Sequence, residues 1–240
     1  MRNSEKMHKI IFMQENRRPT AESNTPLTEQ AVQSLRRDVT MGVLEPGRKL
    51  KLDELQVLYG CSSSPLREAL SRLTQEGLIR SDERKGFRVS DISRSDLQDI
   101  TRMRLMLDVQ ALASAMQLGN DEWEASIVAA HYKLDKLERV LVDGPVVLDE
   151  AWMKAHQEFH MALLSACGSP RLLQLCVNLF EQAERYRQFS ARHRTTHRRK
   201  SSEHKRIMDA VLKRDVSTAR ELLADHIAST ERNVLAVLDL

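Results

Sequence analysis

The sequence has few of the residues that build specialised architectures. Among 240 residues it contains 3 Cys, 8 Gly and 6 Pro, and aromatic residues make up 4%. This scarcity of glycine and proline excludes a collagen-like or linker-dominated chain. Cys61, Cys167 and Cys176 form neither a disulfide framework nor a CxxC metal knuckle. We therefore expect a reducing, cytoplasmic setting.

Long apolar runs are also missing. No stretch approaches the roughly 18 apolar residues that a membrane helix needs, and the apolar residues 10–13 are too few for the core of a signal peptide. We therefore expect no membrane association. The 41% of hydrophobic residues is nevertheless enough for a packed core, and the length suits one large domain or two ordinary ones.

The net charge of +3 is unevenly placed along the chain. Residues 1–92 contain 16 Lys and Arg against 13 Asp and Glu, whereas residues 93–240 contain 21 of each. The positive excess therefore lies wholly in the first segment, which indicates a polyanion partner for that segment.

The first 92 residues follow the pattern of a winged helix-turn-helix domain. Residues 1–23 are polar and basic without periodicity, and we interpret them as a flexible tail, either a solvated extension or an arm that touches DNA. Helical spacing follows over about 25–42, with Thr25 as the cap and Pro26 at the first position. Further helices are predicted over 52–59 and from Ser62 to Gly77. Two β-like runs, 78–80 and 87–89, then flank a polar hairpin tip, so we assign residues 24–92 to this domain.

Residues 93–240 are almost wholly helical in pattern. Ser93 is predicted to cap a helix together with Asp96, and that helix ends at Gly119. Further helices are expected over about 121–142, 148–167, 171–189, 202–213 and 216–238, with a basic, loop-like stretch at 191–200. The sequence therefore predicts a mainly α protein whose second domain, 93–240, is a bundle of six or seven helices.

The third predicted helix has the composition of a DNA recognition helix. Its N-terminal residues would lie near base edges in the major groove, and an arginine such as Arg67 is suited to a bidentate contact with guanine. A single arginine fits a solvated helix face equally well, but the complete arrangement is much more specific. The predicted DNA-binding residues of helix, turn and wing are Ser63, Ser64, Arg67, Arg72, Arg48, Lys49, Lys51, Arg84, Lys85 and Gly86.

A set of histidines marks the helical half. His156 and His160 are four residues apart and share one helix face, while His204 and His226 lie in the last two predicted helices. Imidazoles that converge in a bundle core can bind a divalent transition metal such as Zn or Ni. Ordinary surface or hydrogen-bonded histidines would produce the same spacing.

A metal-dependent enzyme and a purely structural metal site are the alternatives to a regulatory one. The run from His156 to His160 resembles H-E-x-x-H, but Glu158 is one place too late to act as a general base. The sequence has no G-x-S-x-G, Walker or GxGxxG motif. We therefore do not expect an enzyme.

Motifs in both halves carry a family resemblance over about residues 25–238. The first half contains Gly42-x-Leu44-x-Pro46-Gly47, Ser64-Pro65-Leu66-Arg67-Glu68-Ala69-Leu70 and Gly86-Phe87-x-Val89. The second half contains Phe159-His160-x-Ala162-Leu163, Gly168-Ser169-Pro170, Glu203-His204-x-x-Ile207 and Leu223-x-x-His226. On these residues the chain resembles the GntR family of bacterial regulators, in the FadR-like branch with an FCD effector domain.

The resemblance implies a homodimeric repressor that reads a short palindrome and is released from it by a carboxylate. Arg67 matches a DNA-contacting arginine, while Ser63 departs from the arginine that many relatives have. The family's metal site uses one aspartate and three histidines, which correspond to His160, His204 and His226. The aspartate position is His156 here, so the resemblance implies an all-histidine site.

The resemblance also implies the effector pocket. Arg104 matches the arginine that faces the bound carboxylate, and Arg187 matches a basic position near the pocket. Runs such as Ala183-x-Arg185-Tyr186-Arg187 are similar to the carbon-starvation-induced regulators of the family. That similarity implies a small dicarboxylate, glutarate or 2-hydroxyglutarate, as the effector.

Overall fold

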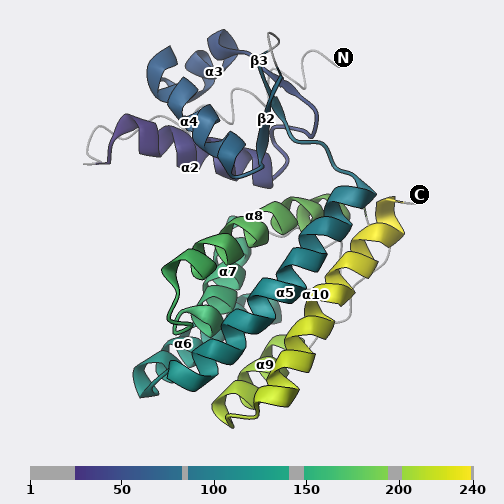
Figure 1. Cartoon of the computed structure of the whole chain (residues 1–240). Helices are drawn as coiled ribbons and strands as arrows, with labels where there is room; N and C mark the ends of the chain where they lie inside the picture. The colour runs from purple at the N-terminus through teal and green to yellow at the C-terminus, as the bar shows by residue number, and fades with distance from the viewer. Residues whose placement is uncertain (1–24, 83–85, 141–148, 194–201, 239–240) are drawn as a thin grey trace. The chain divides into compact units, whose positions relative to one another are not determined.

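The computed structural model describes residues 25–82, 86–140, 149–193 and 202–238, which form two compact units that divide between Asp91 and Ile92 (Figure 1). The sequence pattern placed this division one residue later, after 92. The predicted N-terminal tail and the tip of the wing, with Arg84 and Lys85, lie outside the described residues.

Within the described residues, the first unit contains the three predicted helices and a small sheet. The helices are α2 (Leu27–Thr40), α3 (Leu52–Tyr59) and α4 (Ser63–Gln75). The strands β1 (Lys49–Leu50), β2 (Ile79–Asp82) and β3 (Gly86–Val89) form an antiparallel sheet in the order β1-β3-β2. Gly60 adopts φ +64° and ends α3, so the chain turns directly into α4. The hydrophobic core of this unit includes Leu35, Leu66, Leu70 and Leu73.

One feature of this unit was not predicted, and one prediction for it is wrong. Strand β1 was not predicted, because two residues show no periodicity, and only its pairing with Arg88 and Phe87 reveals it. Thr25 does not cap α2, because Pro26 occupies the N-cap position and no side chain caps there. Thr25 lies one residue too early, and its carbonyl instead accepts a hydrogen bond from Gln30 Nε2 at 2.7 Å.

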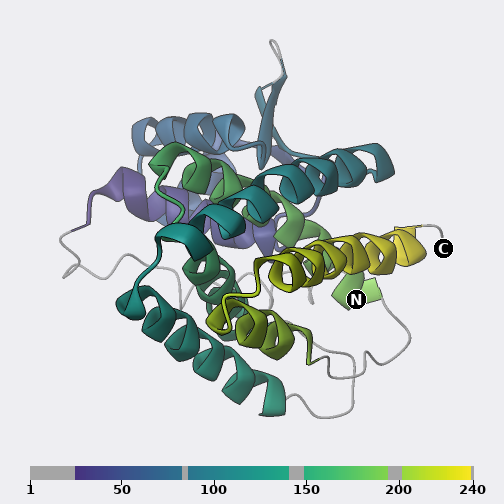
Figure 2. The same cartoon turned by 60° about the horizontal axis from the view of Figure 1, so that its bottom comes forward.

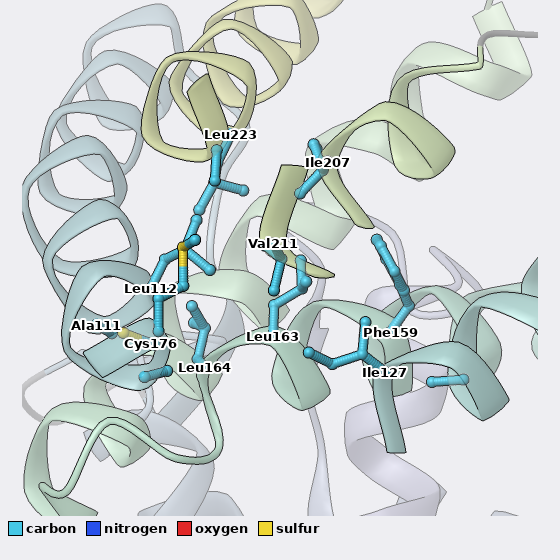
Figure 3. Packing of buried hydrophobic residues seen from close by; sticks show 14 of the residues in the cluster. Ala111, Leu112, Ile127, Phe159, Leu163, Leu164, Cys176, Ile207, Val211 and Leu223 are labelled. Atoms are coloured by element: carbon cyan, nitrogen blue, oxygen red, sulfur yellow. The ribbon is translucent and has the colours of Figure 1, made fainter. Parts of the chain in front are cut away.

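The second unit is a helical bundle, with six helices in the part of the chain that the structure describes (Figure 2). They are α5 (Arg94–Leu118), α6 (Asp121–Val140), α7 (Glu150–Leu164), α8 (Pro170–His193), α9 (Glu203–Leu212) and α10 (Val216–Leu238). Helix α6 packs on α7 and α9, and α5 packs on α8 and α10. Figure 3 shows the apolar core that these helices share, with Leu112, Phe159 and Leu223 among its members.

The ends of the helices follow from identifiable caps. Ser93 caps α5 as predicted, since its Oγ accepts the backbone N–H of Asp96 at 3.2 Å. Asp149 caps α7 in the same way, with Oδ1 2.8 Å from the N–H of Trp152, so α7 starts later than expected. None of the helices within the described ranges is long and apolar enough to cross a membrane.

Helix α8 is longer than the sequence pattern predicted. It continues to His193, so residues 191–193 of the expected loop are helical. The reason is packing, because Ser190 and Ala191 are buried and extend the inner face of the helix. The remainder of that predicted loop lies outside the described residues.

Candidate functional site

The N-terminal end of α4 exposes a polar face. Leu66, Ala69 and Leu70 bury the opposite face, and this burial turns Ser63, Ser64 and Arg67 to the exposed side. Arg67 makes no hydrogen bond or ion pair with any described residue. Its guanidinium is therefore available to a partner.

Arg72, one helical turn further along α4, is held by two carboxylates. Its Nη2 lies 2.6 Å from Glu68 Oε1, and its Nη1 lies 3.4 Å from Glu29 Oε2 on α2. Both pairs are exposed, so they are weak. Arg72 is available to DNA only if these pairs open, unlike Arg67.

Glu54 pairs with two basic residues next to β1, Arg48 and Lys51. Its Oε1 accepts a hydrogen bond from Lys51 Nζ at 2.8 Å, and its Oε2 lies 3.6 Å from Arg48 Nη2. This hydrogen bond raises the pKa of Lys51 and lowers the pKa of Glu54. Lys49 is exposed beside them.

Gly86 starts the second strand of the wing. Its φ of +87° is in the left-handed region that L side chains rarely adopt, while an added Cβ would meet nothing within 4 Å. The backbone conformation, not crowding, therefore requires glycine here. The neighbouring Arg84 and Lys85 lie outside the described residues.

The second unit gathers the predicted histidines into one cluster. His156 and His160 come from α7, His204 from α9 and His226 from α10, and all four are buried. One candidate ligand atom from each ring lies within 4.8 Å of the others. The rings of His204 and His226 have centroids 4.9 Å apart, and those of His160 and His226 are 5.1 Å apart.

Three of the four histidine rings have a carboxylate oxygen near Nδ1. Glu203 Oε2 lies 2.8 Å from His226 Nδ1, Glu138 Oε1 lies 3.2 Å from His204 Nδ1, and Glu184 Oε2 lies 3.8 Å from His156 Nδ1. At His204 and His226 the carboxylate near Nδ1 fixes the ring and leaves the other nitrogen for a metal, whereas the distance between Glu184 and His156 is too long for a hydrogen bond. Glu203 stands in a motif quoted from the sequence, next to His204, but its contact with His226 was not predicted. Glu138 and Glu184 were not predicted at all, because they lie on other helices at unrelated spacings.

The environment favours the neutral form of three rings, those of His156, His160 and His226. Burial, followed by the neighbouring rings and arginines, lowers the pKa of His156 and His160 well below the usual value. Burial also lowers the pKa of His226 to about 4, although Glu203 opposes that shift. Neutral imidazole is the form that binds metals.

Several ring nitrogens in the cluster make no hydrogen bond. His156 Nδ1, His160 Nε2 and His204 Nε2 are buried and make no hydrogen bond. Unpaired buried polar atoms are costly, and converging imidazole nitrogens suit Zn²⁺ or Ni²⁺. The residues therefore fit a divalent transition metal.

Arg104 and Arg187 lie beside the histidine cluster, around one aromatic ring. Their Cζ atoms are 5.2 and 4.5 Å from the ring centroid of Phe180. The rings of His156 and His160 are each 5.3 Å from the same centroid. The structure thus brings together the predicted metal and effector residues, while the predicted DNA-binding residues belong to the other unit.

Each of these arginines has a carboxylate partner. Arg104 is 3% exposed and donates from Nε to Asp108 Oδ2 at 2.9 Å. Its Nη2 lies at the same distance from that oxygen but makes no hydrogen bond. Arg187 donates from Nε to Glu184 Oε2 at 2.7 Å. Arg104 therefore keeps a donor for a further acceptor.

Trp152 completes the surroundings of the cluster. Its ring stacks on His156 with centroids 4.5 Å apart and planes at 17°, and its buried Nε1 has no hydrogen-bond partner. Trp152 was not predicted as a site residue, and its spacing of four residues before His156 is the one available signal in the sequence.

Comparison with known proteins identifies a known domain in each half of the chain. The family model described as bacterial regulatory proteins, gntR family, matches residues 27–89, and the FCD domain model matches residues 99–229. The chain is 35% identical to the HTH-type transcriptional regulator BphR of Paraburkholderia xenovorans, over 85% of this chain and 83% of the relative. It is 36% identical to the HTH-type transcriptional repressor GlaR of Escherichia coli, over 80% of this chain and 89% of the relative.

Solved structures show the same fold. The structure of E. coli McbR/YncC superposes with a TM-score of 0.70 at 19% identity, covering 88% of this chain and 98% of that chain. A putative transcriptional regulator GntR from Rhodococcus superposes with a TM-score of 0.68 at 20% identity, covering 88% of this chain and 99% of that chain.

Proposed function

Because the chain belongs to the GntR family of bacterial transcriptional regulators and carries an FCD domain, we propose that it is a repressor released from its operator by a small carboxylate. It acts as a cytoplasmic homodimer, and the carboxylate binds beside a metal in the FCD domain. The observation that carries the proposal is the placement of Arg104, Arg187 and four buried histidines around Phe180. Family membership makes the protein a regulator and not an enzyme.

The DNA-binding unit would read operator DNA with the exposed end of α4. Arg67 is the unpaired arginine there and contacts guanine, while Ser63 and Ser64 donate to base edges or phosphates. The remaining proposed contacts come from the turn, the helix and the wing: Arg48, Lys49, Lys51, Arg72, Arg84, Lys85 and Gly86. Two copies in a dimer would read the two halves of a palindrome.

The metal would be held by His156, His160, His204 and His226, with Zn²⁺ or Ni²⁺ as the ions that imidazole favours. When bound, it supplies a fixed positive charge at the end of the effector pocket. Glu138 and Glu203 orient the rings of His204 and His226 from the side away from the metal. His156 takes the position of the family aspartate, so the ligand set is neutral where relatives carry one negative charge.

The effector would be a small dicarboxylate, glutarate or 2-hydroxyglutarate. Arg104 offers a donor at Nη2, and arginine suits a carboxylate because its fork matches two oxygens. Arg187, whose Cζ lies 4.5 Å from the centroid of the Phe180 ring, contributes a second guanidinium. The effector must bind the DNA-incompetent arrangement more tightly, because a ligand with equal affinity for both arrangements shifts nothing.

Fluorescence anisotropy tests this function, with the DNA upstream of the protein's own gene as the probe. Specific binding that glutarate or 2-hydroxyglutarate relieves supports a carboxylate-released repressor. Specific binding that is unaffected by either acid contradicts this effector class. A structural metal site predicts a different result, in which chelation lowers the melting temperature but no carboxylate changes DNA binding.

A further inference from the structure

The first turn of α5 is completed by a side chain from another helix. The hydroxyl of Tyr186, on α8, accepts the backbone N–H of Ser93 at 3.2 Å and donates to Asp96 Oδ2 at 2.5 Å. In an ordinary capping box, the carboxylate of the third helical residue itself accepts the N–H of the cap residue. Here the hydroxyl of Tyr186 lies between these two groups, so the start of α5 depends on α8.

Tyr186 is firmly placed in the second unit. Its side chain is fully buried in a small apolar cluster with Leu97 and Ile100 of α5 and Val234 of α10. Burial, together with the hydrogen bond to Asp96, raises the pKa of the Tyr186 hydroxyl. The hydroxyl therefore stays protonated at neutral pH and keeps its role as a donor.

Both helices that this contact joins also carry residues of the proposed effector site. On α8, Tyr186 is followed directly by Arg187, which lies beside the ring of Phe180. On α5, Arg104 lies about 16 Å along the helix axis from Ser93, at 1.5 Å per residue. Packed helices respond to ligands by small sliding movements. A ligand that changes the positions of the two arginines therefore shifts α5 against α8, and Tyr186 joins this same pair of helices.

The chain just before α5 is fastened to the DNA-binding unit. Asp91 ends that unit, and its Oδ2 lies 2.6 Å from Arg80 Nη1 on β2. Ser90 Oγ donates to the carbonyl of Gly77, just after α4, at 2.8 Å. On the other side of the junction, Ile92 packs against the apolar cluster around Tyr186. A displaced start of α5 therefore acts on β2 and on the end of α4 through a short, anchored junction.

We propose that the hydrogen bonds of Tyr186 to Ser93 and Asp96 couple the effector site to the DNA-binding unit, so that release of the operator depends on this hydroxyl. The inference rests on the proposed release by a carboxylate and names a positioning residue that transmits it. Tyr186 acts through the first turn of α5, because its hydroxyl bonds to Ser93 and Asp96 and to none of the proposed metal or effector residues.

Tyr186→Phe tests the inference, because it removes the hydroxyl and keeps the buried ring. Fluorescence anisotropy of the metal-loaded full chain, with the DNA upstream of its own gene, gives the operator Kd without acid and with saturating glutarate or 2-hydroxyglutarate. The ratio of these two Kd values is expected to be at least about fivefold in the wild type. It should fall by about threefold or more in Tyr186→Phe, because a hydrogen bond to a charged acceptor contributes at least that much. An unchanged ratio overturns the inference.

Two further readouts separate coupling from a merely structural role. Calorimetric titration without DNA should show the same affinity for the acid in Tyr186→Phe as in the wild type. Tyr59→Phe is the matched control, since the Tyr59 hydroxyl donates to Asp38 Oδ2 at 2.7 Å within the DNA-binding unit. This variant also loses a buried hydrogen bond from tyrosine to aspartate, and it should keep the wild-type ratio. An equal fall of the ratio in Tyr59→Phe would show that lost stability is responsible, and this result also overturns the inference.

Variants of Asp96 test the contact from its other end. Asp96 is exposed, so its substitution leaves the apolar core intact. Asp96→Ala should lower the ratio as Tyr186→Phe does, whereas Asp96→Asn keeps an acceptor oxygen and should restore most of it. The double variant Tyr186→Phe/Asp96→Ala should have no lower ratio than either single variant, because both remove the same contact. A wild-type ratio in Asp96→Ala contradicts coupling through this contact.

Failure of the inference differs from failure of the proposed function. If the acid releases the operator equally well from the wild type and from Tyr186→Phe, the proposed function stands and the role of Tyr186 is wrong. If neither acid changes the operator affinity of the wild type, the proposed release by a carboxylate is wrong, and the inference is wrong with it.

Discussion

The carboxylate of Glu203 lies 2.8 Å from Nδ1 of His226. Glu203 opens α9, one residue before His204, whereas His226 lies in α10. One residue therefore ties the two C-terminal helices together and orients a ring of the histidine cluster. An imidazole held in this way keeps its other nitrogen available to a metal.

Metal preference is expected to depend on His156. Four imidazoles favour Zn²⁺ or Ni²⁺ over Mn²⁺, and a carboxylate ligand moves preference toward harder ions. His156→Asp should therefore narrow the gap between Zn²⁺ and Mn²⁺ affinity, as measured by competitive metal titration. The exposed His193 serves as the control position, and His193→Asp should leave the gap unchanged. If His156→Asp leaves the difference between Zn²⁺ and Mn²⁺ affinity unchanged, His156 is not a metal ligand.

The metal-free protein is expected to lose stability on acidification. The pKa of His226 falls from 6.5 to about 4 on folding, so between these values the unfolded chain binds a proton that the folded protein refuses. The contribution of neutral His226 to the free energy of unfolding is complete above pH 6.5 and is lost as the pH falls toward 4. Thermal unfolding in the presence of a chelator should show a melting temperature that rises with pH over this window. His226→Gln should reduce the slope, and His193→Gln should not.

Arg67→Ala is expected to weaken specific operator binding by about tenfold to a hundredfold, since one bidentate contact with a base contributes about 1–3 kcal/mol. The helical content should not change, because Arg67 is exposed and unpaired among the described residues. Arg102→Ala is the matched control, an arginine whose side chain is 70% exposed on α5. Equal operator affinity of wild type and Arg67→Ala in anisotropy titrations would refute the recognition-helix assignment.

Removing the charge of Glu54 should strengthen DNA binding. Glu54 is paired with both Lys51 and Arg48, so Glu54→Gln releases two cations for phosphate contact. Exposed pairs are weak, so a gain of about twofold to fivefold is expected at low salt, with a steeper dependence on salt concentration. Asp53→Asn changes the net charge equally without breaking these pairs. A gain of the same size in Asp53→Asn would show that net charge alone is responsible.

Arg104→Ala should leave operator binding intact and blunt the response to the effector. Arg104 is buried and contacts Asp108, so Arg104→Lys is the companion variant that keeps the charge but loses the fork. In anisotropy titrations of the DNA complex with glutarate or 2-hydroxyglutarate, both variants should need more acid than wild type. An unchanged dose–response in Arg104→Ala would exclude Arg104 from the pocket.

The sequence predicted the helices well where glycine or a capping side chain marks an end. Gly60 and Gly119 end helices, and the Ser93 cap begins one, because backbone conformation and capping are local properties. Strand β1 was missed because its only signal is pairing with a strand some forty residues away. Helix α8 exceeded its predicted end because tertiary burial of Ser190 and Ala191 extends it.

The candidate site was predictable only in part for the same reason. His156 and His160 share a helix face that spacing reveals. His204 and His226 were grouped with them as histidines of the last two predicted helices, and Arg104 and Arg187 were added through a family resemblance. The structure brings all six together. Glu138 and Glu184 have no sequence signature, because their positions near the rings come from the packing of α6 and α8 around the cluster, and the only signal for Trp152 is its spacing before His156.

The central claim is that the histidine cluster and the two arginines form one effector site. Calorimetric titration of glutarate and 2-hydroxyglutarate into metal-loaded and metal-stripped protein tests it most directly. At least one acid is expected to bind the loaded protein, and removal of the metal is expected to weaken its binding by about tenfold or more, because the metal and Arg104 would share the carboxylate. Equal affinity for the loaded and stripped protein would contradict a shared site.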